Sequence, residues 1–246
     1  MIDSQSGTYP LRLPGTSQGQ PHAEAAYRNV LCSLVNRDTE WLDLGCGRSL
    51  IRDWLPGAHD VQMQLRHTCK RIAGIDLEKA DVDRNPYIHE AYVGSVEQLP
   101  FADRSFSLVT AQMVVEHVSA PLAMLKECAR VLVPGGHFLF ITPNLKNLLI
   151  AAASIVPDAI KRPLTSLAQM RDANDIFPTR YRMNTSAAIE KTLSLAGMTP
   201  ELIEHIDGFP DLTGLPFVSL VERLIRAIQP QTCRSDLLVL ARKPAS

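Results

Sequence analysis

The chain has 246 residues, of which 46% are hydrophobic and 21% are charged, so it is long enough to bury the core of one sizeable domain. Its formal net charge is -1 at pH 7, and no local basic patch stands out, which excludes a general attraction to nucleic acid or anionic lipid. No window approaches the roughly 18 apolar residues of a membrane span, no signal peptide is evident, and the five cysteines are scattered without CxxC spacing, so we expect a cytoplasmic protein.

The first part of the chain predicts one β-α-β unit behind a flexible start. Residues 1–22 are rich in Gly, Ser, Pro and Gln and are expected to be a flexible N-terminal segment. Apolar residues recur at helical spacing over 23–35, which predicts an amphipathic helix. A strand is predicted at 40–44, a helix beginning near 48–49, and a second strand at 71–76.

The same alternation continues through the middle of the chain. The predicted elements there are strands at 91–93, 105–110 and 137–141 and a helix at 120–131. Alternating strands and helices indicate an α/β fold with a doubly wound, mostly parallel sheet. In such sheets the ligand binds at the carboxyl ends of the strands.

Two apolar insertions interrupt the later part of this pattern. Residues 143–180 contain an apolar helical run followed by prolines, which predicts a lid after the fifth strand. A helix starts at 184–186 and stops before a glycine. Strands at 201–207 and 236–241 complete a seven-stranded sheet, and a second apolar helical segment at 208–229 lies between them. Residues 23–246 are therefore expected to form a single domain.

A glycine-rich turn follows the first predicted strand, in the stretch Asp43-Leu44-Gly45-Cys46-Gly47. Glycine lets the backbone approach a ligand where a Cβ would collide, and a helix start behind the turn would offer free N–H groups. Asp76, at the tip of the second strand, is placed to accept hydrogen bonds from ribose hydroxyls. Together these features indicate a nucleoside site. A dinucleotide fingerprint needs a third glycine where this chain has Leu50, so a nicotinamide cofactor is disfavoured.

Four ordered blocks of sequence resemble the class I S-adenosylmethionine-dependent methyltransferases, and among them the type 11 group. The blocks are LDLGCG at 42–47, GIDL at 74–77, GSVEQLPFADRSFSLV at 94–109 with VVEHV at 114–118, and ECARVLVPGGHFLFITPN at 127–144. The resemblance implies a Rossmann-like methyltransferase fold with helical lid insertions, S-adenosylmethionine as the cofactor, and a small molecule as the methyl acceptor.

The same resemblance assigns residues to the methionine part of the cofactor. Asp43 would lie near its amino group, and Gly45, Cys46 and Gly47 would lie along it. Gln112, just past the fourth strand, would help to wall the pocket near the methionine. Cys46 is interpreted as a small residue that fits the turn, not as a nucleophile.

A second set of residues is assigned to the nucleoside. Asp76 would hold the ribose hydroxyls, Leu77 would lie against the adenine, and Ser95 and Val96 would contact the adenine edge. Family members usually carry Asp where this chain has Ser95, and often a glycine where it has Ser49. These departures keep open a relative that binds the cofactor without catalysing transfer.

His117, in the block VVEHV, is the candidate general base for a hydroxyl acceptor. It could instead close the cofactor pocket or bond to backbone. Glu116 beside it has no third ligand at a recognisable spacing, so no metal site is expected. The apolar insertions could cover a lipid-like acceptor, or they could pack on the core. The polar side chains of Arg180, Tyr181 and Arg182 could contact an anionic or sugar-bearing acceptor, or they could face water.

Three functions are consistent with these features. The favoured one is an S-adenosylmethionine-dependent methyltransferase acting on a small molecule, with oxygen as the favoured methylated atom. The alternative is a non-catalytic S-adenosylmethionine-binding protein that serves as a partner or scaffold. A nicotinamide-dependent oxidoreductase is the third.

Overall fold

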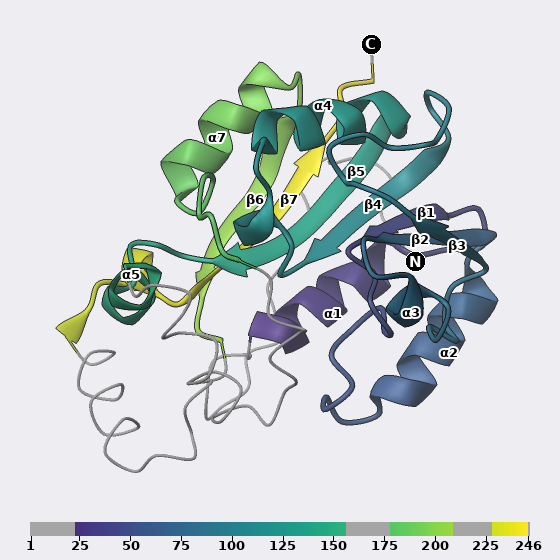
Figure 1. Ribbon diagram of the computed structural model, residues 1–246, viewed down its shortest axis with the longest axis horizontal. Coiled ribbons are helices and arrows are strands. Elements are labelled where there is room, and N and C mark those ends of the chain that lie inside the picture. The colour runs from purple at the N-terminus through teal and green to yellow at the C-terminus, as the bar shows by residue number, and fades with distance from the viewer. Residues whose placement is uncertain (1–22, 156–177, 209–227, 246) are drawn as a thin grey trace, which may run out of the picture.

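The computed structural model describes residues 23–155, 178–208 and 228–245, which alternate between strands and helices (Figure 1). The described strands are β1 (Glu40–Leu44), β2 (Arg71–Asp76), β3 (Glu90–Val93), β4 (Phe106–Gln112), β5 (Leu132–Pro143), β6 (Thr199–Ile206) and β7 (Asp236–Arg242). The described helices are α1 (Ala23–Leu34), α2 (Ala58–Thr68), α3 (Lys79–Val82), α4 (Pro121–Val131), α5 (Leu148–Ser154) and α7 (Ser186–Leu195), with 3₁₀ turns η1 (Val115–His117) and η3 (Gln231–Cys233). The predicted flexible start at 1–22 and much of the two predicted insertions, at 156–177 and 209–227, lie outside the described residues.

The strands form one seven-stranded sheet in the order β3-β2-β1-β4-β5-β7-β6. Neighbours from β3 to β5 are parallel, whereas β7 runs antiparallel to both β5 and β6. The chain winds outward in opposite directions from β1 and β4, and ligands of such sheets bind at the carboxyl ends beside that switch point. The predicted α/β fold with a doubly wound, mostly parallel sheet is confirmed.

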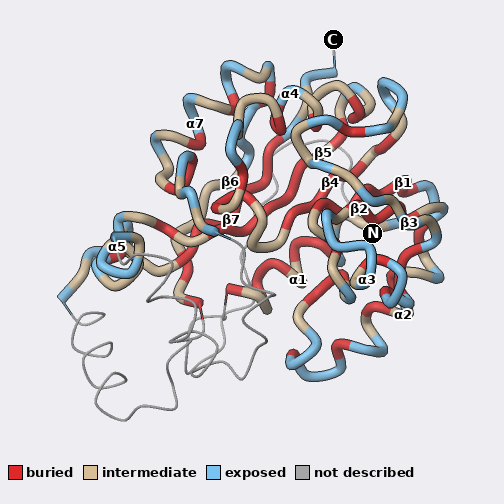
Figure 2. The backbone as a smooth tube through the Cα atoms, in the orientation of Figure 1, coloured by how far each residue is buried: buried red, intermediate tan, exposed pale blue. Residues whose placement is uncertain are grey.

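Helices cover both faces of the sheet (Figure 1), and the strands are accordingly buried (Figure 2). α4 and α7 lie on one face, where Leu125 and Leu193 join a core with Phe138. α1 and α2 lie on the other face, where Tyr27 joins a second core with Trp41. Burial on both faces explains why the central strands are almost continuously apolar in sequence. None of the described helices is long and apolar enough to cross a membrane.

The helix predicted to begin near 48–49 is wrong, because α2 begins only at Ala58. The intervening residues form turns and bends, and they bury Leu50 and Ile51 in the core beside α1. Gln62 of α2 holds this loop, since its Oε1 accepts hydrogen bonds from the backbone N–H of Leu50 (2.7 Å) and of Ile51 (3.2 Å). The groups behind the glycine turn therefore belong to an anchored loop and not to a helix start.

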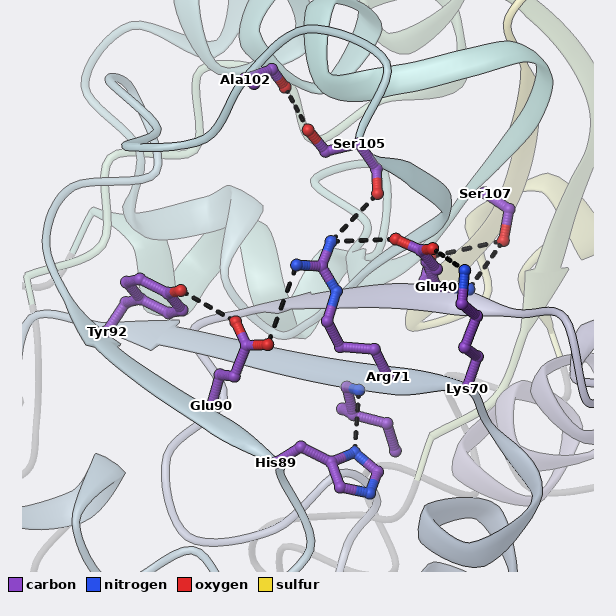
Figure 3. A network of polar contacts seen from close by, with 10 residues as sticks. Glu40, Lys70, Arg71, His89, Glu90, Tyr92, Ala102, Ser105 and Ser107 are labelled. Carbon is purple, nitrogen blue, oxygen red and sulfur yellow. Dashed lines mark hydrogen bonds and ion pairs between the residues drawn. The ribbon is translucent and has the colours of Figure 1, made fainter.

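A network of charged side chains crosses the amino ends of β1, β2 and β3 (Figure 3). Arg71 is at its centre, because Nη2 lies 3.1 Å from Glu40 Oε2 and 3.1 Å from Ser105 O, while Nη1 lies 3.8 Å from Glu90 Oε1. The guanidinium also lies over the ring of Phe106, 4.8 Å from its centroid. A cavity of about 310 Å³ lies beside this amino-edge network, at the edge opposite the glycine turn. These contacts tie three neighbouring strands together.

We predict that Arg71→Met destabilises the fold by about 1–2 kcal/mol, because it removes hydrogen bonds and an ion pair from a partly buried network. Urea unfolding followed by circular dichroism measures this difference. Lys79→Met is the control, since the Lys79–Asp83 pair is exposed and its loss is expected to cost less than about 0.5 kcal/mol. Equal losses for the two variants would contradict a stabilising role for the network.

Candidate functional site

The glycine turn sits at the carboxyl end of β1, where the chain leaves the sheet. The backbone N–H groups of Gly45 and Cys46 both donate to Ile75 O on β2, at 2.8 and 3.2 Å. Gly45 has φ +62°, and a Cβ there would collide with Cγ2 of Val114. Gly47 has φ +43°, and a Cβ there would meet nothing within 4 Å. Packing therefore requires glycine at 45, while the backbone at 47 borders open space that a ligand can fill.

Cys46 supports the turn from the protein side. Its side chain is buried, and a Cβ on Gly74 of β2 would lie only 2.7 Å from its Sγ. The amide Nδ2 of Asn85 donates to the carbonyls of Cys46 (3.1 Å) and Gly47 (3.2 Å). Burial raises the pKa of the Cys46 thiol well above its ordinary range, so the thiolate is disfavoured. The interpretation of Cys46 as a packing residue accords with this environment.

Asp76 joins the glycine turn to the loop after β2. Its Oδ2 accepts from the backbone N–H of Gly47 (2.9 Å), and its Oδ1 accepts from that of Glu78 (3.1 Å). Leu77 beside it is 61% exposed, and Val93, which pairs with Asp76 across the sheet, is 53% exposed. The carboxylate thus lies next to an uncovered apolar surface.

The chain after β3 borders this surface. Ser95 is exposed, and its Oγ accepts a hydrogen bond from the backbone N–H of Glu97 at 3.1 Å. Val96 is half-buried and packs against the core beneath α4. The hydroxyl of Ser95 therefore shapes its own turn, where an aspartate would have placed a charge.

Asp43 is a buried residue at the carboxyl end of β1, one residue before the strand ends. Its Oδ1 accepts from Oγ1 of Thr110 on β4, and that hydroxyl accepts from Nε1 of Trp41 at 2.6 Å. Burial raises the pKa of Asp43 to about 8; the hydrogen bond from Thr110 opposes this effect, and the nearby charge of Asp76 adds to it. A cation placed beside Asp43 would favour the ionised form.

Gln112 ends β4 on the same side of the strand as Thr110. Its Nε2 is buried and has no hydrogen-bond partner among the described residues. A buried amide that donates no hydrogen bond is costly, and a ligand acceptor at this position would remove that cost. This end of β4 therefore offers a buried donor two residues beyond Thr110, the residue that pairs with Asp43.

η1 carries Glu116 and His117 just past β4. His117 is partly exposed, and its Nδ1 lies 3.1 Å from Pro178 O. Glu116 is buried, and its Oε2 accepts from Oγ1 of Thr142 (3.0 Å), which in turn accepts from Nδ2 of Asn184 (2.7 Å). Burial raises the pKa of Glu116, and the neighbouring His117 is the largest opposing influence.

The fold brings the sequence-predicted residues to one edge of the sheet. They lie at or just beyond the carboxyl ends of β1, β2, β3 and β4, and they are Asp43, Gly45, Cys46, Gly47, Asp76, Leu77, Ser95, Val96, Gln112 and His117. Sequence reasoning did not assign Thr142 to the site and treated Asn184 only as a possible helix start. Their link to Glu116 joins segments far apart in the chain, and no local spacing signals it.

Comparison with known proteins supports a methyltransferase domain. Residues 42–140 match the family model described as "Methyltransferase domain". A probable S-adenosylmethionine-dependent methyltransferase from Mycolicibacterium smegmatis is 32% identical over 125 residues, which are 49% of this chain and 44% of that protein. A ubiquinone biosynthesis O-methyltransferase from Albidiferax ferrireducens is 28% identical over 148 residues, which are 58% of this chain and 57% of that protein. The chain thus spans about half the length of the curated relatives it matches.

A solved structure shares the fold over a longer stretch. It is a geranyl diphosphate C-methyltransferase from Streptomyces coelicolor, in complex with Mg²⁺, geranyl diphosphate and S-adenosyl-L-homocysteine. The two chains are 17% identical and superpose with a TM-score of 0.55, over 89% of this chain and 79% of the other. At this identity the likeness concerns the fold alone.

We predict that Asp43→Asn stabilises the free protein more at pH 8 than at pH 5. A folded-state pKa of about 8 against an unfolded value of about 3.9 means that the folded protein binds the extra proton between these pH values. The wild type therefore loses stability as pH rises through this window, at up to about 1.4 kcal/mol per pH unit, and asparagine removes that loss.

Urea unfolding of both proteins between pH 5 and 8 tests this prediction. The exposed Asp38→Asn is the matched control, since it makes the same chemical change in solvent. A difference between Asp43→Asn and wild type that stays constant with pH would show that the buried carboxyl carries no such cost.

Proposed function

We propose that this protein uses S-adenosylmethionine to methylate a small-molecule acceptor, because residues 42–140 match the model of a methyltransferase domain and a probable S-adenosylmethionine-dependent methyltransferase is 32% identical over 125 residues. The observation that carries the proposal is the glycine turn that Asp76 holds beside an exposed apolar surface.

The nucleoside end of the cofactor fits the residues around Asp76. A carboxylate has about four lone-pair positions, and Asp76 uses two of them for backbone N–H groups, so two can still accept from ribose hydroxyls. Leu77 and Val93 supply apolar surface for an adenine ring. Gly47 leaves room for the ligand to lie flush against the backbone.

The methionine end carries an ammonium and a carboxylate, and the chain offers a matching group for each. The carboxyl of Asp43 would pair with the ammonium, which offsets the cost of ionising it in the core. The buried Nε2 of Gln112 would donate to the cofactor carboxylate. When bound, S-adenosylmethionine supplies an activated methyl group on a sulfonium.

We favour a hydroxyl as the acceptor group. A hydroxyl gains from a base that removes its proton, and His117 lies past β4 on the same sheet edge, with part of its side chain exposed. The name of the Albidiferax relative, an O-methyltransferase, points in the same direction. We also favour an apolar or lipid-like acceptor, because the sequences of the two insertions are apolar.

The prediction for the cofactor site concerns Asp76. Asp76→Ala is expected to weaken binding of S-adenosylhomocysteine at least about tenfold, since it removes charge-assisted hydrogen bonds to the ribose. Isothermal titration calorimetry measures the affinity, and circular dichroism checks the fold. Asp83→Ala, an exposed acid just past α3, is the matched control and is expected to bind as wild type. Unchanged affinity in folded Asp76→Ala would refute the site.

Turnover separates this function from its alternatives. Transfer of a labelled methyl group from S-adenosylmethionine to any member of a panel of phenols and apolar alcohols supports the proposal. Tight cofactor binding with no transfer across the panel would favour the non-catalytic binding protein. Saturable binding of NAD(H) without binding of S-adenosylhomocysteine would favour the oxidoreductase.

A further inference from the structure

Tyr27 of α1 carries a buried hydroxyl that has no hydrogen-bond partner among the described residues. The residue is fully buried, and it packs in the core on the α1 face of the sheet together with Trp41. A hydroxyl left unpaired in a core costs free energy, which a phenylalanine of nearly the same shape would avoid. A bound ligand is one partner that would remove this cost.

Two groups of the candidate site act on this hydroxyl, and they are the carboxyl of Asp43 and the hydroxyl of Thr110. Burial raises the pKa of Tyr27 well above its ordinary range, the nearby Asp43 adds to this effect, and Thr110 opposes it. The phenol therefore keeps its proton at neutral pH. Thr110 accepts from Nε1 of Trp41 and gives its only proton to Asp43, so Tyr27 cannot accept from Thr110. Tyr27 thus stands beside Asp43 as a neutral donor.

The direction of α1 also places Tyr27 near the site. The backbone N–H of Ala23, at the start of α1, donates to Asp207 O at 3.1 Å, and Asp207 directly follows β6. β5 and β6 are both antiparallel to β7, so β6 runs in the direction of β5 and ends at the same edge as the glycine turn. Tyr27 lies about one helical turn from the start of α1. Its hydroxyl therefore belongs to the carboxyl edge of the sheet.

Two unpartnered donors lie on this side of β4. Thr110 pairs with Asp43 across the strands, and Gln112 follows on the same face, about 7 Å further along β4. Nε2 of Gln112 and the hydroxyl of Tyr27 are both buried without a partner among the described residues. A ligand carboxylate has two oxygens and can accept from both donors, while a ligand ammonium would face Asp43. The three side chains together match the ionic groups of an amino acid.

We propose that Tyr27 is a specificity-determining residue whose hydroxyl donates to the carboxylate of the cofactor's methionine part. The inference rests on the proposed function, and it adds a residue of α1 to a site otherwise built from strand ends. The carboxylate would accept from Tyr27 and Gln112, and Asp43 would hold the ammonium. A nucleoside without the carboxylate would lose these two donors and keep the contacts at Asp76.

The test is a binding titration of Tyr27→Phe with two compounds that differ in one group. Decarboxylated S-adenosylmethionine lacks the carboxylate of S-adenosylmethionine and keeps its ammonium, sulfonium and nucleoside. Isothermal titration calorimetry without any acceptor measures both affinities. Tyr27→Phe is expected to bind S-adenosylmethionine at least about fivefold more weakly than wild type, because a hydrogen bond to a charged group is lost. Its affinity for the decarboxylated compound is expected to stay within about twofold of wild type.

Tyr92→Phe is the matched control, since it makes the same chemical change at a hydroxyl that already donates to Glu90 at 2.8 Å. It is expected to bind both compounds as wild type does. Urea unfolding of the free proteins adds a second readout. Tyr27→Phe is expected to be at least as stable as wild type, because it removes an unpartnered polar group. Lower stability with unchanged affinity for S-adenosylmethionine would assign the hydroxyl to the fold alone and overturn the proposal.

The other outcomes separate this inference from the proposed function. Wild-type affinity for S-adenosylmethionine in folded Tyr27→Phe would remove the role of Tyr27 and leave the cofactor site at Asp76 intact. An equal loss for both compounds would also remove that role, because the hydroxyl would then not act through the carboxylate. A wild-type protein that binds neither compound would overturn the proposed function, and this inference with it.

A measurement on the wild type decides the matter should Tyr27→Phe fail to fold. The ¹³Cζ NMR signal of Tyr27 is expected to shift when S-adenosylmethionine binds and to stay in place when the decarboxylated compound binds. Equal shifts with the two compounds, or no shift with either, would refute the contact.

Discussion

One backbone contact determines the geometry of the candidate site: two consecutive N–H groups, of Gly45 and Cys46, converge on the carbonyl of Ile75 in the neighbouring strand. This contact ends β1 while β2 continues to Asp76, so the carboxylate reaches beyond the turn and accepts from Gly47. A side chain at 45 would collide with Val114, so the turn also fixes how closely the end of β4 approaches. The candidate cofactor surface and the start of η1 are therefore positioned by the same bend.

The sheet edge at the site is built at a cost to stability. Asp43 and Glu116 are both buried carboxyls, and burial raises the pKa of each. Apolar residues at these positions would stabilise the free protein, because a buried polar group contributes little unless it is fully paired. Carboxyls with pKa values shifted in this way cluster at functional sites, which agrees with the place of both residues at the candidate site.

Sequence reasoning located the strands well, because buried parallel strands and glycine turns are local features. It also predicted that the candidate site residues lie together, since parallel strands place their carboxyl ends on one edge whatever the helices between them do. The helix expected near 48–49 was wrong because Leu50 and Ile51 are held by Gln62, a tertiary contact that helical spacing cannot reveal. The link from Glu116 to Asn184 was missed for the same reason, as it runs from η1 through β5 to the loop before α7.

The two ends of the strands differ in how their polar groups are paired. At the amino ends, each oxygen of Glu40 faces a cation, Lys70 at 2.6 Å and Arg71 at 3.1 Å, so charge there stabilises strand pairing. At the carboxyl ends, the Nε2 of Gln112 and the Oδ1 of Asn184 are buried without partners among the described residues. Because both edges belong to the same strands, ion pairs at one end can offset the unpaired groups at the other. The fold can therefore carry these unpaired groups at the candidate site and keep its strand register.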